Sequence, residues 1–219
     1  MVQLSVSAAC AYVRKTLDEL TSVEDLGMLV SPDALDIHKI VEDSIVEAAV
    51  RVHRLAPSSM IDGDVAVDGT DYELEIPEGS DVATLTMKVD TLRIASVKAC
   101  DSDYVVTDTV PEDSPEGRKQ LNSFVRGVPD DPTLVLCKVW DGDNLPVFKY
   151  YSFSSDTAEK TMDVTYVPYP VIEETIIKIC PKLEFAVLNE IVAMVLDAFS
   201  EHERAALFRE KSRAYFENK

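Results

Sequence analysis

Apolar residues recur every three or four positions through much of the first 56 residues, which is the spacing of an amphipathic helix. The longer helix is predicted to start at Ser31 and Pro32, because a hydroxyl side chain caps a helix start and proline gives up no hydrogen bond at the first helical position. A shorter helix is predicted over residues 5–20, forming a hairpin with it through the stretch around Gly27. The apolar stripe of the longer helix consists of Ala34, Ile37, Val41, Ile45, Ala48, Val52 and Leu55.

From residue 71 to residue 166 apolar and polar positions alternate, and β-branched and aromatic residues are frequent, as in half-buried strands. One short helix is expected here, from a cap at Ser114 and Pro115 to about Phe124. The sequence Asp141-Gly142-Asp143-Asn144 predicts a hairpin turn, since these residue types tolerate positive φ. The candidate strands are 72–76, 82–89, 91–98, 134–139, 147–153 and 162–167.

The last 39 residues return to helical spacing. The helix predicted over 182–199 is apolar around most of its circumference. Because exposing so many large apolar side chains would be costly, it must be buried on several sides by its own chain or by a neighbouring subunit. Ser200 and Glu203 have the spacing of a capping box, which predicts the start of a second helix.

Together these patterns predict an α+β protein. The N-terminal helical hairpin (residues 1–56) and the two C-terminal helices (residues 181–219) are expected to pack as one unit. Between them, residues 57–180 are expected to form an acidic, central antiparallel β region, rich in hairpins and containing the one short helix.

The chain is strongly acidic, and this excludes some functions. It has 40 acidic against 21 basic side chains and a net charge of −19, which argues against a surface that grips nucleic-acid phosphates or anionic lipid. No apolar run approaches the length of a membrane-spanning helix, and the start lacks the pattern of a secretion signal. We therefore expect a soluble, unexported protein without a membrane partner.

The acidity is concentrated between residues 62 and 81, where there are eight carboxylates and no Lys or Arg. Such a segment repels itself and should be extended and exposed. It is interpreted either as a solvated loop and edge strand or as a surface that faces a DNA channel and keeps the polyanion from sticking. The eight residues are Asp62, Asp64, Asp68, Asp71, Glu73, Glu75, Glu78 and Asp81.

No motif for catalysis, cofactor binding or a metal site is complete in this sequence. The stretch from Asp62 begins like an EF-hand loop but has Val67 where that loop needs glycine. The histidines, His38, His53 and His202, lie among charged residues and are interpreted as surface residues. The cysteines lack the spacing of a zinc site and are interpreted as buried hydrophobes; they are Cys10, Cys100, Cys137 and Cys180. The sequence therefore assigns no catalytic, cofactor or metal-binding residue.

A small group of basic residues, Arg118, Lys119 and Arg126, lies on and just after the short helix. It is interpreted either as the solvated face of that helix or as an interface that meets an acidic patch on a neighbouring copy. The terminal helices offer a second candidate interface. Its residues in the closing helix are Leu188, Val192 and Phe199.

Several short motifs follow residue 91: LRIASV (92–97), SPE (114–116), QLN (120–122), RGVP (126–129), PTLVL (132–136), YYS (150–152), YVPYP (166–170) and the leucine-rich helix from Leu183. Together they resemble proteins from the neck of crAss-like tailed phages. The resemblance covers about three fifths of the chain and excludes the acidic segment and the first helices.

The resemblance implies a virion structural protein rather than an enzyme: a ring-forming subunit of the head-tail connector, stacked near the portal. Its partners would be further copies of itself, the portal and other neck or tail proteins, with DNA passing by without specific binding. No catalytic residue or cofactor is carried over. Two alternatives stay open, a carboxylate-dependent metal hydrolase or nuclease and an acidic assembly chaperone.

Overall fold

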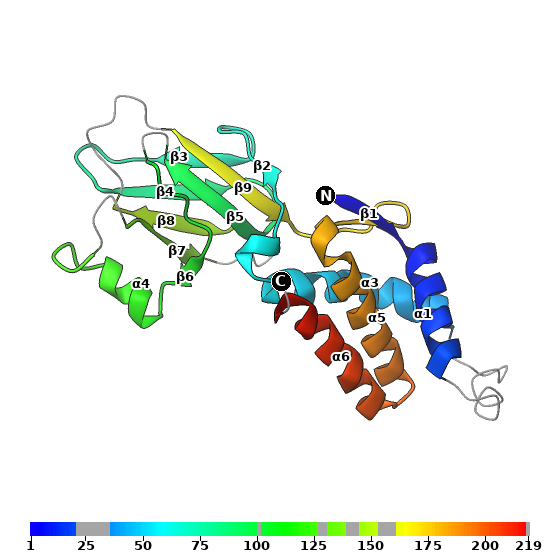
Figure 1. The fold of residues 1–219 in the computed structure, drawn as a ribbon. Coiled ribbons are helices and arrows are strands. Elements are labelled where there is room, and N and C mark those ends of the chain that lie inside the picture. Colours follow the sequence, from blue (N-terminus) through cyan, green and yellow to red (C-terminus); the bar gives the residue numbers. More distant parts are fainter. Residues whose placement is uncertain (21–35, 100–101, 127–130, 139–144, 153–160, 218–219) are drawn as a thin grey trace. The chain divides into compact units, whose positions relative to one another are not determined.

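The structure is a computed structural model that describes residues 1–219 except 21–35, 100–101, 127–130, 139–144, 153–160 and 218–219. The chain divides into two units (Figure 1). Unit 1 contains both ends of the chain, Met1–Ile61 and Pro170–Lys219, and unit 2 is Asp62–Tyr169. The α+β fold class is confirmed. Residues 57–61 and 170–180, which the sequence pattern placed in the middle segment, belong to the helical unit.

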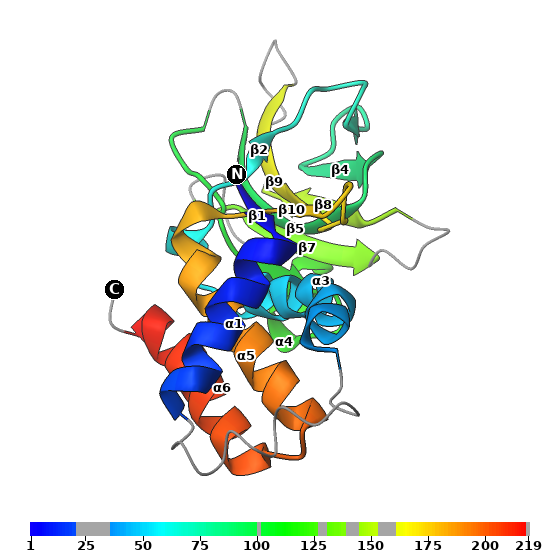
Figure 2. The same ribbon diagram turned by 90° about the vertical axis from the view of Figure 1, so that its right-hand side faces the viewer.

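Unit 1 is built around helix α5 (Glu184–Ala198), which packs against α1 (Val6–Leu20), α3 (Ile37–Leu55) and α6 (His202–Glu217) (Figures 1 and 2). The helices of its own chain therefore surround this apolar rod. Burying each large apolar side chain contributes roughly 1.5–3 kcal/mol, so α5 anchors the unit. Its fully buried residues include Ala186, Val187, Ile191, Val192, Ala193 and Val195.

Two helix starts differ from the sequence-based expectation. Helix α3 begins after Asp36, whose carboxylate accepts a hydrogen bond from the amide of His38 at 2.9 Å, and the start signal at Ser31 and Pro32 lies outside the described residues. The predicted capping box is wrong, because α6 begins only at His202 and Ser200 has a φ of 64°. Ser200 instead ends α5 in the left-handed conformation, and the next amide bonds to the carbonyl of Leu196.

A short antiparallel sheet in unit 1 was not predicted. Strand β1 (Val2–Ser5) pairs with β10 (Ile176–Ile179), with Val2 opposite Ile179. Both strands are too short to show a clear alternating pattern, and β1 runs directly into α1. Short 3₁₀ helices, η1 (Ser58–Met60) and η2 (Pro181–Leu183), follow α3 and precede α5. This pairing explains why residues 170–180 belong to unit 1.

The prediction of a surface position is wrong for His53, which is only 1% exposed; His38 and His202 are exposed as predicted. The ring Nδ1 of His53 lies 2.7 Å from the carbonyl oxygen of Ala49, and Nε2 accepts a hydrogen bond from the amide of Cys180 at 3.1 Å. Since Nε2 accepts, Nδ1 carries the proton and donates. The imidazole thus connects α3 to the end of β10 and satisfies a buried amide.

A chain of charged side chains joins α3, α5 and α6. The Glu190 carboxylate is almost buried and lies 3.3 Å from Nη1 of Arg51 and 3.6 Å from Nε of Arg209. Arg209 also pairs with Asp197, which lies 3.0 Å from Nδ1 of His202. Hydrogen bonds from His202 and Arg209 lower the pKa of Asp197. A buried carboxylate without such partners would be strongly destabilising, so the arginines offset the cost of burying Glu190.

Unit 2 contains two sheets with one shared core, and the prediction of six strands from 72 to 167 is confirmed to within a few residues at each end. The three-stranded sheet has the order β2-β9-β5, and the five-stranded sheet has the order β3-β4-β8-β7-β6. The strands of the first are β2 (Asp64–Val65), β9 (Met162–Pro168) and β5 (Thr91–Ala99). Those of the second are β3 (Tyr72–Glu75), β4 (Val82–Met87), β8 (Val147–Tyr151), β7 (Thr133–Lys138) and β6 (Thr109–Pro111).

The sheets are antiparallel with one exception, because β6 runs parallel to β7. Side chains of both sheets meet in the core, where Leu85 and Leu134 of one sheet and Val97 and Val164 of the other are buried. The hydroxyl of Tyr72 donates to the carbonyl of Met162 at 2.6 Å and joins the sheets directly. The predicted turn at 141–144, between β7 and β8, lies outside the described residues.

The lowered pKa of Asp197 predicts a pH-dependent contribution to the stability of unit 1. The carboxylate is favoured in the folded state, so its contribution is present above the pKa of an unfolded aspartate and is lost as the pH falls through the folded value. Asp197→Asn should therefore lower the free energy of unfolding at neutral pH, and the difference from the wild type should shrink in acid. Urea unfolding over a pH series measures this.

The matched control is Glu210→Gln, an exposed carboxyl on α6. Its effect on the free energy of unfolding should stay within about 0.5 kcal/mol at every pH. A difference between wild type and Asp197→Asn that does not change with pH would contradict the role assigned to this carboxylate.

Candidate functional site

The short helix of unit 2, α4 (Pro115–Gln120), is held tightly against β6. The hydroxyl of Ser114 accepts a hydrogen bond from the amide of Gly117 at 3.0 Å and donates to the carbonyl of Pro111 at 2.7 Å. A Cβ on Gly117 would lie 2.2 Å from that same carbonyl oxygen, so this close approach requires glycine. The predicted cap is confirmed, although α4 ends at Gln120 rather than near Phe124.

Immediately after α4 the chain exposes three large apolar side chains, Leu121, Phe124 and Val125, which we call the tip. Phe124 is 98% exposed, and Leu121 and Val125 are each 57% exposed. The side-chain oxygen of Asn122 accepts a hydrogen bond from the amide of Phe124 at 3.0 Å. The backbone carbonyl of Asn122 accepts hydrogen bonds from the amides of Val125 and Arg126. These local hydrogen bonds give the tip a defined conformation, and clustered exposed apolar side chains mark interaction surfaces.

The three basic residues predicted as a group have different environments. Arg118 and Lys119 are exposed and form no ion pair with any residue that the structure describes. Arg126 is only 12% exposed and pairs with Asp81 at 2.7 Å, with its guanidinium 5.3 Å from the centre of the Tyr151 ring. Arg126 thus anchors the base of the tip to β8 and to the residue before β4, while the other two cations face solvent.

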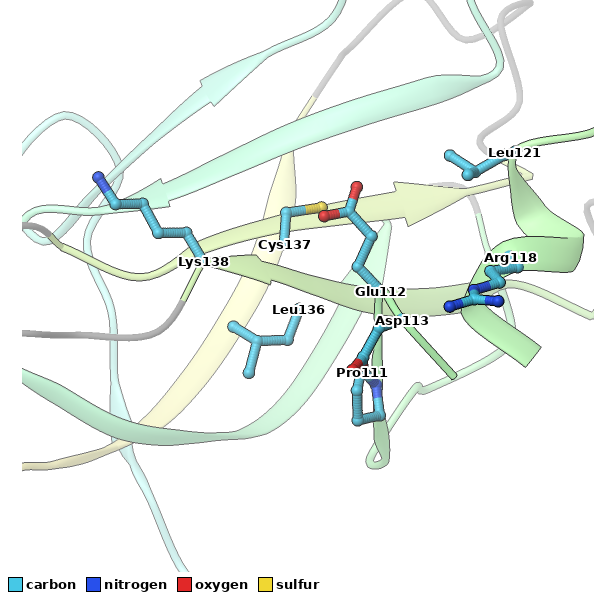
Figure 3. Close-up of a pocket in the computed structure, with 8 residues that line it drawn as sticks. All are labelled: Pro111, Glu112, Asp113, Arg118, Leu121, Leu136, Cys137 and Lys138. Atoms are coloured by element: carbon cyan, nitrogen blue, oxygen red, sulfur yellow. The ribbon is translucent and has the colours of Figure 1, made fainter. Parts of the chain in front are cut away.

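An open groove of about 420 Å³ lies beside α4, between the helix and strands β6 and β7 (Figure 3). The carboxylate of Glu112 extends toward the sulfur of Cys137 in this groove. Burial, together with the negative charge of Glu112, raises the pKa of the Cys137 thiol. The groove is lined by Pro111, Glu112, Asp113, Arg118, Leu121, Leu136, Cys137 and Lys138.

The groove does not give Cys137 the features of a nucleophilic cysteine. A thiol with a raised pKa is mostly protonated at neutral pH, and the thiolate is the nucleophilic form. None of the eight lining residues is a histidine that could act as its base. Cys10 and Cys180 are buried in unit 1, Cys137 is half-buried, and Cys100 lies outside the described residues.

The acidic segment covers β2, β3 and the connections around them. Of its eight carboxylates only Asp71 is partly buried, and it accepts a hydrogen bond from the amide of Val67 at 2.8 Å. Glu73 pairs with Lys88 at 3.3 Å, and Asp81 pairs with Arg126. The other carboxylates, Asp62, Asp64, Asp68, Glu75 and Glu78, are exposed.

Among the described residues no three His, Cys, Asp or Glu side chains are grouped to hold a metal ion. Whether the segment faces a DNA channel stays a prediction.

Two apolar side chains are exposed within this acidic segment. Val65 is 76% exposed and Val67 is 58% exposed, whereas Ala66 between them is buried in the core. Residues two apart on an extended chain share a face, so the two exposed valines lie on one face, and the exposed residues Asp64 and Asp68 precede and follow them in the chain. The described part of the acidic segment therefore exposes both apolar side chains and carboxylates.

The candidate interface on the closing helix is largely taken up by its own chain. Val192 is completely buried within unit 1. Leu188 and Phe199 are half-buried and could contribute only part of a contact. The exposed apolar residues of the tip and of the acidic segment were missed from the sequence; the pattern of valines alternating through an otherwise polar stretch is a signal that could have found Val65 and Val67.

Comparison with family models, curated proteins and solved structures finds no match to this chain. In the part of the chain that the structure describes, no helix combines the length and the apolar character needed to cross a bilayer. Function is therefore inferred from the chemistry of the tip and the acidic segment.

Replacing Arg126 with Ala should destabilise unit 2, because Asp81 loses its partner and the Tyr151 ring loses its cover. We expect a loss of about 1–2 kcal/mol in the free energy of unfolding, less than for a fully buried pair because Asp81 is half exposed. Arg118→Ala is the matched control and should change the free energy by less than about 0.5 kcal/mol. Equal effects of the two substitutions in urea unfolding would contradict the anchoring role.

Proposed function

We propose that this protein is a virion structural protein: a ring-forming subunit of a phage head-tail connector, stacked near the portal, that acts by assembling around the DNA path. The motifs from residue 92 onward resemble neck proteins of crAss-like phages. Members of such rings commonly combine a helical bundle with a β portion, and units 1 and 2 agree with that combination. These features support the proposal, and the tip carries it.

The tip supports a role in assembly because its exposure is costly for an isolated subunit. Phe124 is almost completely exposed although burial of such a side chain is worth roughly 1.5–3 kcal/mol. Arg118 and Lys119 lie next to it, in a unit where residues 62–169 contain 22 acidic and only 9 basic side chains. An apolar and cationic projection on an acidic body is suited to contact an acidic neighbour.

The acidic segment supports the proposed relation to DNA. Its exposed carboxylates repel phosphate groups, so DNA can pass such a surface without being held by it. The other partners in this proposal are the portal and further neck or tail proteins. The protein would be made in the host cytoplasm and would remain in the finished particle.

Quantitative mass spectrometry of purified phage particles tests this function. We expect the protein in the particles at a fixed ratio to the portal protein, which serves as the internal reference, while a phage replication enzyme serves as the negative control. Loss of the protein during particle purification, with the portal retained, would contradict a connector and fit an assembly chaperone.

A further inference from the structure

We infer that the tip of one copy docks on the edge of the acidic segment of a second copy, around Val65 and Val67. This inference rests on the proposed function, for which it supplies the contact between neighbouring subunits. Both contacting surfaces belong to unit 2, and both partners are copies of this chain.

The tip defines what its partner must offer. Leu121, Phe124 and Val125 need an apolar surface to remove them from water. Arg118 and Lys119, on the exposed face of α4, need carboxylates at the border of that surface. The partner must therefore present apolar side chains flanked by acidic ones.

The acidic segment of this chain has that combination. Val65 and Val67 are exposed in it, and the exposed residues Asp64 and Asp68 come directly before and after them in the chain. Among the described strands β2, with only two residues, pairs only with β9, so it forms an edge of the three-stranded sheet where a neighbour could approach. In the proposed contact the apolar side chains of the tip pack on the two valines, and the two cations approach carboxylates. This is the complementarity expected of a specific interface.

The tip cannot reach this surface in its own copy. Arg126, the residue after the tip, pairs with Asp81 just before β4, whereas Asp68 bridges to Tyr72, which lies opposite Met87 at the other end of β4. The five residue steps from Val82 to Met87 span roughly 17 Å at about 3.4 Å each. In both views α4 and β2 lie on different sides of unit 2 (Figures 1 and 2).

Because the two surfaces are different and lie on different sides of unit 2, the contact is heterologous. Each copy uses its tip on one neighbour and offers its β2 edge to another, and such contacts close into rings or continue as filaments. The overall negative charge also favours this pairing. Unit 2 has a net charge of −13, so two copies repel each other wherever their acidic surfaces meet. Arg118 and Lys119 form one cationic surface that is attracted to an acidic surface of another copy.

Photo-crosslinking from position 124 tests the contact. The full chain carries p-benzoylphenylalanine in place of Phe124, a substitution that an almost fully exposed site should tolerate. Equal amounts of ¹⁴N- and ¹⁵N-labelled protein are mixed at high concentration and irradiated, so that crosslinks between copies appear as mixed-isotope peptide pairs. We expect such pairs to join position 124 to residues 62–68, and Arg118→Glu with Lys119→Glu to reduce their yield at least fivefold.

The control places the same photo-crosslinker at Leu207, an exposed apolar residue of α6 in unit 1, and should give no product at residues 62–68. Crosslinks from position 124 to another tip, to its own copy only, to any other segment, or to nothing would each overturn the docking inference. Particle composition separates the two proposals: protein present in particles without the crosslink leaves the connector function standing on a different contact.

Discussion

Like-charge repulsion is the constraint on which the account of this molecule depends. Unit 2 carries far more carboxylates than cations, and most carboxylates of its acidic segment are exposed. Any attraction between copies must therefore come from the few places where a cation or an apolar side chain is exposed. The structure brings two cations and three apolar residues together at the end of α4, and it exposes two valines within the acidic segment.

Unit 1 differs from unit 2, because the apolar residues of its central helix are largely buried within the chain. Helix α5 is surrounded by α1, α3 and α6, and its buried carboxylate Glu190 has arginine partners on both α3 and α6. A rod that is already buried does not need a neighbouring subunit. In the proposed ring, association would draw on the exposed apolar residues of the tip and of the β2 edge of unit 2.

Sequence periodicity predicted the α+β order, the helices and six strands because these elements are long enough to repeat their pattern several times. It failed where tertiary contacts decide. His53 is buried only because the amide of Cys180, far away in sequence, meets its ring, and Ser200 ends one helix rather than starting the next. The basic group was predicted, but the different environments of its members were not: Arg126 pairs with Asp81, which is 45 residues earlier in the chain, while Arg118 and Lys119 face solvent.

Sedimentation velocity of two complementary variants tests the central claim, that copies assemble through unlike surfaces of unit 2, most directly. Phe124→Glu places a carboxylate among the apolar residues of the tip, and Val65→Lys places a cation on the β2 edge that Arg118 and Lys119 would meet; both positions are highly exposed. The account predicts that each variant alone stays monomeric at concentrations where the wild type associates. An equimolar mixture should form larger species, because the intact edge of one accepts the intact tip of the other. A mixture that sediments as two independent monomers, or variants that associate as the wild type does, would contradict it.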